Sequence, residues 1–409
     1  MRYFILIIYL LFTIKISGQN NKVGITSEFN FESNALNLDF INSLLYGGNI
    51  NEETKVKWIN LSQEENKIHT LFQNEFYFKR KIKNNNLGFK ISDVNTLDIS
   101  FSKDLLKLVL NGNFEYQNQT VIFNQTHIRA NRYQKYNLQY ELNLNQKSFL
   151  LGLSYLKGNH NINLNIYEGS LYTADYGEYI DINYNINGFI TDTSNISLFK
   201  NNGNGLAVDL ALQFDYKEYE INLYLEDLGF IKWNKNSISL AADSTFIYNG
   251  INVDNIFNYN DSIFNNSITN ENYINNQKES YISNIATNIG FSVKGESRNT
   301  NFNYFIFGLN SKWQPYTYKR EKSLKIITDG FKQSNYKTLL YISSEINNKY
   351  CKILPQISYG GYSEDLNLGL AIKIESKISL ILGTKHLEDF LNKDDRKSIS
   401  LFINIFKIL

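Results

Sequence analysis

The sequence predicts an all-β protein, folded as one closed antiparallel transmembrane β-barrel of about 14 strands, within a range of about 12 to 16. Apolar and polar residues alternate along most of the chain after residue 70, as in strands with one apolar and one polar face. The usual alternating segment has about 8 to 10 residues, which suits a tilted membrane strand, whereas strands of soluble sandwiches average about 5 or 6 residues. An N-terminal leader predicts export to the compartment where such barrels occur.

The composition supports strands and excludes several classes of function. The 409 residues include 29 Tyr and 28 Phe but only 2 Pro, and aromatic residues favour strands. The 41 basic and 40 acidic residues give a net charge of +1, so nothing suggests a nucleic acid as partner. The single cysteine, Cys351, excludes an intramolecular disulfide and any multi-cysteine metal site.

Residues 1–18 have the features of a secretory signal peptide. Arg2 supplies the positive start, Tyr3 to Ile14 the apolar core, and Ser17 and Gly18 a small-residue cleavage site. The apolar core is too short for a membrane-spanning helix. Residues 19–409 are then a single outer-membrane barrel domain, because no internal repeat and no boundary to a second domain is visible.

The hairpin from Ala207 to Trp233 gives the most specific prediction of which side chains face lipid and which face the lumen. Its two strands alternate strictly around the turn Lys217 to Tyr219, which we expect at the end of the barrel with short turns. The apolar set is expected to face lipid: Val208, Leu210, Leu212, Phe214, Ile221, Leu223 and Leu225. The polar set is expected to line the lumen: Asp209, Gln213, Asn222 and Glu226. A second sheet covering the apolar face, as in a soluble exported β-sandwich such as an adhesin, is the alternative.

Three segments depart from the alternation. Residues 102–112 read as a short helix capped by Ser102 and ended by Gly112, either plugging or lying on one barrel end, or capping the core. Val23 to Ile50 is a candidate N-terminal plug. The Asn-rich stretch 234–280 is expected as a long polar loop, either on the outer side of the barrel or as an insertion without a role.

Aromatic residues at strand ends are typical of the belts at membrane interfaces. We expect this role for Tyr216 with Tyr219, Phe230 with Trp233, and Trp313 with Tyr316. The C-terminal "SISLFINIFKIL" resembles the strand by which outer-membrane barrels are recognised for assembly, although it ends on Leu409 where that signal has an aromatic residue.

The sequence carries no catalytic signature. The four histidines, His69, His127, His160 and His386, have no ligand spacing, and no HExxH, CxxC, P-loop or GxSxG motif is present. His127 is the one histidine beside a dense polar and basic cluster, and the carboxylates of the hairpin are those that alternation predicts for a wet lining. We therefore expect no catalytic residue, no cofactor and no metal ligand, and a protein that is not an enzyme.

Three landmarks resemble a Bacteroidetes-type family of outer-membrane β-barrels of unknown function, which is distantly similar to the FadL/PorV-like barrels. They are "FSKDLLKLVLNGN", "RYQKYNLQYEL" and "GNGLAVDLALQF" followed by "YEINLYLEDLGFIKWNKNS". The segment Asp227 to Trp233 is the most specific piece, whereas "ESNALN" stands where such proteins often carry Asn-Pro-Ala. The resemblance covers about residues 20–409 and implies an outer-membrane location, without any activity.

Two functions follow from a membrane barrel, and a soluble exported β-sandwich adhesin is the third alternative. The first is passage or binding of a hydrophobic small molecule through the barrel. The second is a non-enzymatic scaffold that holds partners in secretion, gliding or surface assembly. The expected partners are outer-membrane lipid, the barrel-assembly machinery during insertion, and either a hydrophobic ligand or proteins of a secretion system.

Overall fold

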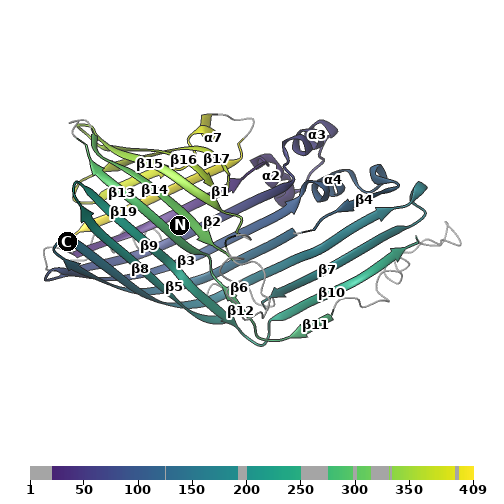
Figure 1. Ribbon diagram of the computed structural model, residues 1–409, viewed down its shortest axis with the longest axis horizontal. Coiled ribbons are helices and arrows are strands. Elements are labelled where there is room, and N and C mark those ends of the chain that lie inside the picture. Colours follow the sequence, from purple (N-terminus) through teal and green to yellow (C-terminus); the bar gives the residue numbers. More distant parts are fainter. Residues whose placement is uncertain are drawn as a thin grey trace.

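The computed structural model describes residues 21–124, 126–191, 200–249, 275–297, 302–314, 331, 334–391 and 396–409 (Figure 1). The predicted signal peptide at 1–18, and Tyr316 of the expected aromatic belt, lie outside these residues. Within the described part of the chain, no helix is both long and apolar enough to cross a membrane.

Fourteen antiparallel strands form a closed barrel, which confirms the predicted fold class. Closure is made by the two ends of the chain, because β1 pairs with β19 on one side and with β2 on the other. Closure leaves no strand edge in the wall, so every wall strand has two neighbours. The wall consists of β1 (Asn21–Ser33), β2 (Glu65–Ile82), β3 (Asn85–Ser102), β5 (Thr126–Leu144), β6 (Lys147–Thr173), β8 (Gly203–Tyr216), β9 (Tyr219–Trp233), β13 (Thr287–Glu296), β14 (Phe302–Trp313), β15 (Lys337–Asn347), β16 (Lys352–Gly361), β17 (Asp365–Ile374), β18 (Ser379–Thr384) and β19 (Ser398–Ile408).

The two ends of the barrel differ. At the end that holds Asn21 and Leu409, the connections are brief, as in the two-residue turns after Ile82 and Tyr216. The opposite end carries the helices and the long connections (Figure 1). We call them the turn end and the loop end. Membrane barrels show this same contrast between short periplasmic turns and long outer loops.

Part of the sheet continues past the barrel wall at the loop end. β6 has 27 residues and pairs first with β8 and then, from Ile162 onward, with β7. β10 follows β7, so this extension leaves the barrel as a blade (Figure 1). Its strands are β4 (Gln119–Ile122), β7 (Ile180–Ile190), β10 (Ile238–Tyr248) and β11 (Asn275–Lys278), and β12 (Ile282–Asn284) pairs with β9 at its base.

The expected polar loop at 234–280 is therefore wrong in part. Residues 238–248 and 275–278 are strands β10 and β11, paired with each other in the extension. The stretch "ISLAADSTFIY" does alternate, but its many polar residues hid the pattern beside the Asn-rich sequence that follows. Residues 250–274 lie outside the described part of the chain.

Helices pack on the rim of the loop end. They are α2 (Leu38–Tyr46), α3 (Glu52–Leu61), α4 (Lys103–Asn111) and α7 (Glu388–Leu391), with the 3-10 turns η1 (Phe114–Tyr116) and η2 (Asp175–Gly177). An apolar cluster that includes Phe40, Trp58 and Leu106 joins α2, α3 and α4 to the ends of β1 and β2. The helix expected at 102–112 is confirmed, since Ser102 Oγ accepts from Leu105 N at 3.1 Å and Gly112 N donates to Leu108 O at 2.9 Å.

The candidate plug at Val23 to Ile50 is wrong for its first half. Residues 21–33 form β1, the strand that closes the barrel wall, and α2 follows on the rim. The sequence "KVGITSEFNF" alternates like a wall strand. The prediction of a plug was wrong because β1 begins only a few residues after the predicted signal peptide, well before residue 70, where the alternating strands were expected to start.

A β-bulge reverses the sidedness of β9. The register between β8 and β9 slips between Val208 and Leu210, and Asp227 has a positive φ of 64°. Before the bulge, Leu223 is exposed on the odd-numbered face; after it, Leu228 and Phe230 are exposed on the even-numbered face. One extra residue shifts the period-2 pattern in this way, and it turns Ile231 and Trp233 into the interior.

Trp233 consequently does not belong to an aromatic belt. Its ring is 1% exposed, and its Nε1 donates to Ser283 Oγ at 2.8 Å. It packs with Tyr281, Leu156 and Ile231 in an apolar cluster that fills one side of the interior at the loop end. Its partner in the expectation, Phe230, does lie exposed on the outside.

Candidate lumenal binding site

The barrel interior contains a polar cavity of about 660 Å³. It reaches from β1 and β2 to β9, β13, β14, β15, β16 and β17, so it lies within the lumen and spans much of its width. We call it the polar chamber. Its lining contains seven side-chain amides. Six lie along the wall, namely Asn30, Gln73, Asn222, Asn288, Asn310 and Gln356, and the seventh, Asn367, lies at the loop end.

A second cavity of about 320 Å³ adjoins the first and is mostly apolar. The two cavities share Gln356 and Lys385 in their linings. Apolar side chains from five strands line this apolar chamber: Ile306, Leu354, Ala371, Ile381 and Phe402. Ile306 and Leu354 lie close to the starts of β14 and β16, so the apolar chamber is displaced toward the turn end.

Two tyrosines lie flat against the wall of the polar chamber. A Cβ added at Gly290 would come within 2.0 Å of the Tyr224 ring, and one at Gly308 within 2.4 Å of the Tyr341 ring. Each glycine therefore makes room for the ring of a tyrosine on the neighbouring strand. The rings are held in place and present flat aromatic surfaces to the lumen.

The turn between β16 and β17 folds inward over the loop end of the lumen. Gly360 and Gly361, with φ of 108° and 78°, permit the reversal. Glu32 Oε2 on β1 accepts from Tyr362 N at 3.0 Å and from Ser363 N at 3.3 Å, and Lys67 Nζ on β2 binds Glu364 Oε1 at 2.7 Å. The turn is thus bonded to β1 and β2, which lie beyond the junction where β19 pairs with β1.

A hydrogen-bonded bridge crosses the lumen beneath this turn. His69 Nδ1 lies 2.7 Å from Asp98 Oδ1, and Gln314 Nε2 donates to Asp98 Oδ2 at 2.9 Å. Asp98 belongs to β3, whereas Gln314 follows β14, six strands away around the fourteen-strand wall. All three side chains are buried.

Lys312 completes this closure from the β14 side. Its Nζ lies 5.1 Å from the centre of the Tyr336 ring and 4.9 Å from that of Tyr362, within the range of a cation–π contact. The two rings meet edge to face with centroids 4.9 Å apart. Charged and aromatic groups from several strands therefore meet across the loop end of the lumen.

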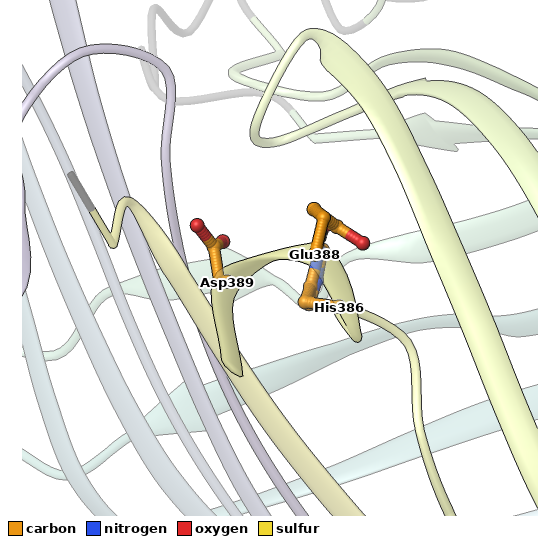
Figure 2. Close-up of side chains that lie close together, drawn as sticks. All are labelled: His386, Glu388 and Asp389. Atoms are coloured by element: carbon orange, nitrogen blue, oxygen red, sulfur yellow. Dashed lines mark ion pairs between the residues drawn. The ribbon is translucent and has the colours of Figure 1, made fainter. Parts of the chain in front are cut away.

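A second cluster ties the loop before α7 to β1. Figure 2 shows His386, Glu388 and Asp389 together there. His386 Nε2 lies 3.5 Å from Glu32 Oε1, and its Nδ1 lies 3.4 Å from Glu388 Oε1 and 3.0 Å from Asn367 Oδ1. Burial lowers the pKa of His386, but the carboxylates of Glu32 and Glu388 outweigh burial and raise the pKa to about 9.

This cluster is engaged in holding the loop. A histidine with so high a pKa is protonated at neutral pH, so its imidazolium pairs with the carboxylates of Glu32 and Glu388. Glu388 Oε2 accepts from Leu368 N at 2.7 Å, and Asp389 Oδ2 accepts from Ser398 N at 2.9 Å. The three side chains therefore fasten α7 and the loop before it to β1, β17 and β19.

The apolar set predicted to face lipid lies on the side of the hairpin away from the cavities. Asn222, Tyr224 and Glu226 line the polar chamber, and the residues between them point outward. Leu210, Leu212 and Leu223 are exposed, and Val208, Phe214, Ile221 and Leu225 are half-buried. That this surface contacts lipid remains a prediction.

The polar set predicted to face the lumen divides into two groups. Asn222 and Glu226 line the polar chamber, and Gln213 follows the chamber residue Ala211 on the same face. Asp209 is 4% exposed and accepts from Asn137 Nδ2 and Asp227 N, both at 2.9 Å. Lys135 Nζ lies 3.2 Å from Asp209 and 2.5 Å from Asp227, so Asp209 anchors the bulge.

The histidine noted beside the polar and basic cluster does not line the cavity, whereas two other histidines do. His127 lies half-buried in β5, where its Nδ1 is 2.9 Å from Asn165 Oδ1, and it does not line the polar chamber. His69 and His386 do line it. His69 and Asp98 are 29 residues apart, and the signal that could have revealed them is their position on the polar face of alternating strands.

Several solved structures resemble the chain at low identity. The "TodX deltaS2S3 mutant monoaromatic hydrocarbon channel" has a TM-score of 0.47 at 6% identity, covering 96% of this chain and 91% of its own. The toluene transporter TodX of Pseudomonas putida has a TM-score of 0.41 at 6% identity, covering 96% and 88%. The translocator domain of the autotransporter NalP from Neisseria meningitidis has a TM-score of 0.31 at 6% identity, covering 100% and 96%.

No curated protein matches the chain. Residues 4–329 of the 409 match a family described as "Family of unknown function (DUF5723)". The predicted resemblance to a family of unknown function is thereby confirmed over most of the chain. With a match of this extent on a closed fourteen-strand barrel, the chain belongs to the DUF5723 family.

Proposed function

We propose that the protein is an outer-membrane β-barrel that binds or passes a small molecule with an apolar portion in its lumen. The apolar chamber carries this proposal. It is large enough for a small ligand, and it lies inside a closed wall whose outer side exposes leucine, isoleucine and phenylalanine. A lumen packed solid with side chains would have no place for such a ligand.

The membrane location has two further supports. A bilayer requires that every backbone N–H and C=O be paired, and a closed barrel satisfies this requirement. The contrast between the turn end and the loop end suggests that the turn end faces the periplasm and the loop end faces outward. Lipid on the outer wall and the barrel-assembly machinery during insertion are the partners that this proposal includes.

Gel migration of the membrane fraction tests the location. We expect the unboiled protein to migrate differently from the boiled protein, because a folded membrane barrel resists detergent. Recovery in the soluble periplasmic or secreted fraction, with the same migration in both samples, would reject it in favour of a soluble exported protein.

Uptake by liposomes tests the ligand. Vesicles that contain the purified barrel are expected to take up an apolar probe such as octanol-linked dye faster than empty vesicles do. Two variants form a matched pair. Ile306→Trp fills the apolar chamber and should reduce uptake, and Phe307→Trp, on the outer face of the same strand, is its control. Equal uptake by all samples would reject the proposal.

The extension favours a second function, that of a scaffold. β6, β7 and β10 form a sheet that stands clear of the barrel wall, and such a sheet offers a surface to proteins of secretion, gliding or surface assembly. Cross-linking in cells from a cysteine placed in β7 tests it. Recovery of the barrel-assembly machinery alone would count against a scaffold.

A further inference from the structure

We propose that the ligand of the lumen is a neutral, polyhydroxylated amphiphile, whose sugar-like head occupies the polar chamber and whose alkyl part enters the apolar chamber. This inference rests on the proposed function and narrows it to one class of molecule. The two chambers adjoin at Gln356 and Lys385. One ligand with two unlike parts can therefore fill both.

Two described asparagines on opposite walls of the polar chamber carry buried acceptors without a partner. Among the described residues, Asn30 Oδ1 on β1 and Asn310 Oδ1 on β14 are buried without a hydrogen-bond partner. Both asparagines line the polar chamber. Leaving a buried acceptor unpaired is unfavourable, so a ligand or water that reaches these oxygens with a hydrogen-bond donor is stabilised.

The charges of the polar chamber are already balanced. Glu28, Glu32 and Glu226 face Lys312, Lys385 and the protonated His386. Lys385 Nζ pairs with Glu28, and His386 pairs with Glu32. Lys312 lies over two tyrosine rings, and Glu226 makes no ion pair with another described residue, so one cation and one acid are left and their charges offset each other. A charged head would enter a chamber that has no net counter-charge, and this favours a neutral head.

Hydroxyl groups suit the remaining lining. A side-chain amide offers both a carbonyl acceptor and an NH₂ donor, and a hydroxyl can both accept and donate. A polyol can therefore bond to several of the six amides along the wall at once. The fixed rings of Tyr224 and Tyr341 add flat apolar surfaces beside them, against which the C–H faces of a sugar ring can lie.

Three ligands with alkyl chains of seven or eight carbons and different heads test the inference. The purified barrel in lipid nanodiscs is dialysed at equilibrium against octyl glucoside, octanoate or octyltrimethylammonium, each below its micelle concentration. We expect the glucoside to bind about tenfold more tightly than the two charged ligands, as loss of about one hydrogen bond to the charged heads implies.

Variants locate the two parts of the ligand. Asn310→Leu should remove the preference for the glucoside, and Ser311→Leu, the next residue on the opposite face of β14, should keep it. Ile306→Trp should abolish binding of all three ligands, and Phe307→Trp should not. Migration of unboiled samples on a gel confirms that each variant is folded.

The outcomes separate this inference from the proposed function. If octanoate or octyltrimethylammonium binds as tightly as the glucoside, the inference about the head is overturned and the proposed function stands. If a folded barrel binds none of the three, the proposed function fails as well. Glucoside binding that survives Ile306→Trp would overturn the placement of the alkyl part in the apolar chamber.

Discussion

The ring of Tyr362 stacks on the imidazole of His69, with centroids 3.6 Å apart and planes 6° apart. Tyr362 is in the turn that follows β16, and His69 is in β2, so the contact joins two sides of the barrel across its loop end. Both rings are buried. The pair therefore forms part of the lining of the polar chamber at its loop end.

Removing this contact should open the loop end. In Tyr362→Ala we expect a higher single-channel conductance in planar bilayers, and a loss of about 3–5 kcal/mol in the free energy of unfolding. Tyr359→Ala is the matched control, because Tyr359 lies exposed on the outer side of β16. A conductance that stays at the wild-type value would show that other groups close the lumen.

Arginine at neighbouring positions of β8 should separate the two faces of the hairpin. Leu212→Arg places a charge on the face predicted to contact lipid and should cost about 2–4 kcal/mol near the middle of the bilayer. Gln213→Arg places the same charge on the lumenal face and should cost far less. Urea unfolding from lipid vesicles measures both. Equal losses would contradict the predicted sidedness.

Asp209 should be far more sensitive than other acidic residues of the same strand. Asp209→Ala leaves the buried Lys135 with Asp227 as its one remaining carboxylate partner in the described contacts and should cost about 3–5 kcal/mol. Asp215→Ala, at the exposed end of β8, should change stability little. A similar loss in both variants, measured by the same unfolding experiment, would argue against the anchoring role.

Stability should fall as the pH rises above neutrality. The pKa of His386 is raised from an ordinary 6.5 to about 9, so its stabilising effect is complete below about pH 6.5 and is lost as the pH passes through 9. The raised pKa is worth on the order of 3 kcal/mol. Unfolding from vesicles at a series of pH values measures this loss.

His386→Gln is the variant that isolates this effect. It removes the titrating group facing Glu32, Glu388 and the neighbouring Asp389, so its stability should be lower at neutral pH and nearly constant between pH 6.5 and 9. A variant that keeps the wild-type pH dependence would assign the effect to another group.

The wall of the barrel could be predicted from the sequence because period-2 alternation records which side of a strand meets an apolar environment. The helix at 102–112 could be predicted from a different signal, because Ser102 and Gly112 supply caps at its two ends. The prediction from alternation failed at Asp227, where the bulge adds one residue. The two consecutive polar residues Glu226 and Asp227 mark this shift in the alternation, but the prediction did not use them. Trp233 was misplaced for that reason.

The site was less predictable than the wall. Alternation indicated that Asn222 and Glu226 face the interior, but it could not show that Asn30 and Asn310 approach one cavity from opposite walls. Such proximity depends on how the sheet closes and on the register of each pair. The bridge of His69, Asp98 and Gln314 is likewise invisible locally, because 216 residues separate its last two members.

The length of β6 has a mechanical consequence. At about 3.3 Å per residue, its 27 residues extend roughly 90 Å, whereas the apolar band of a membrane barrel is only about 25 Å tall. Hydrogen bonds to β5 at its start and to β7 at its end join the barrel wall and the extension through one continuous strand. A force applied at the tip of the blade would therefore act with leverage on the strands around the lumen.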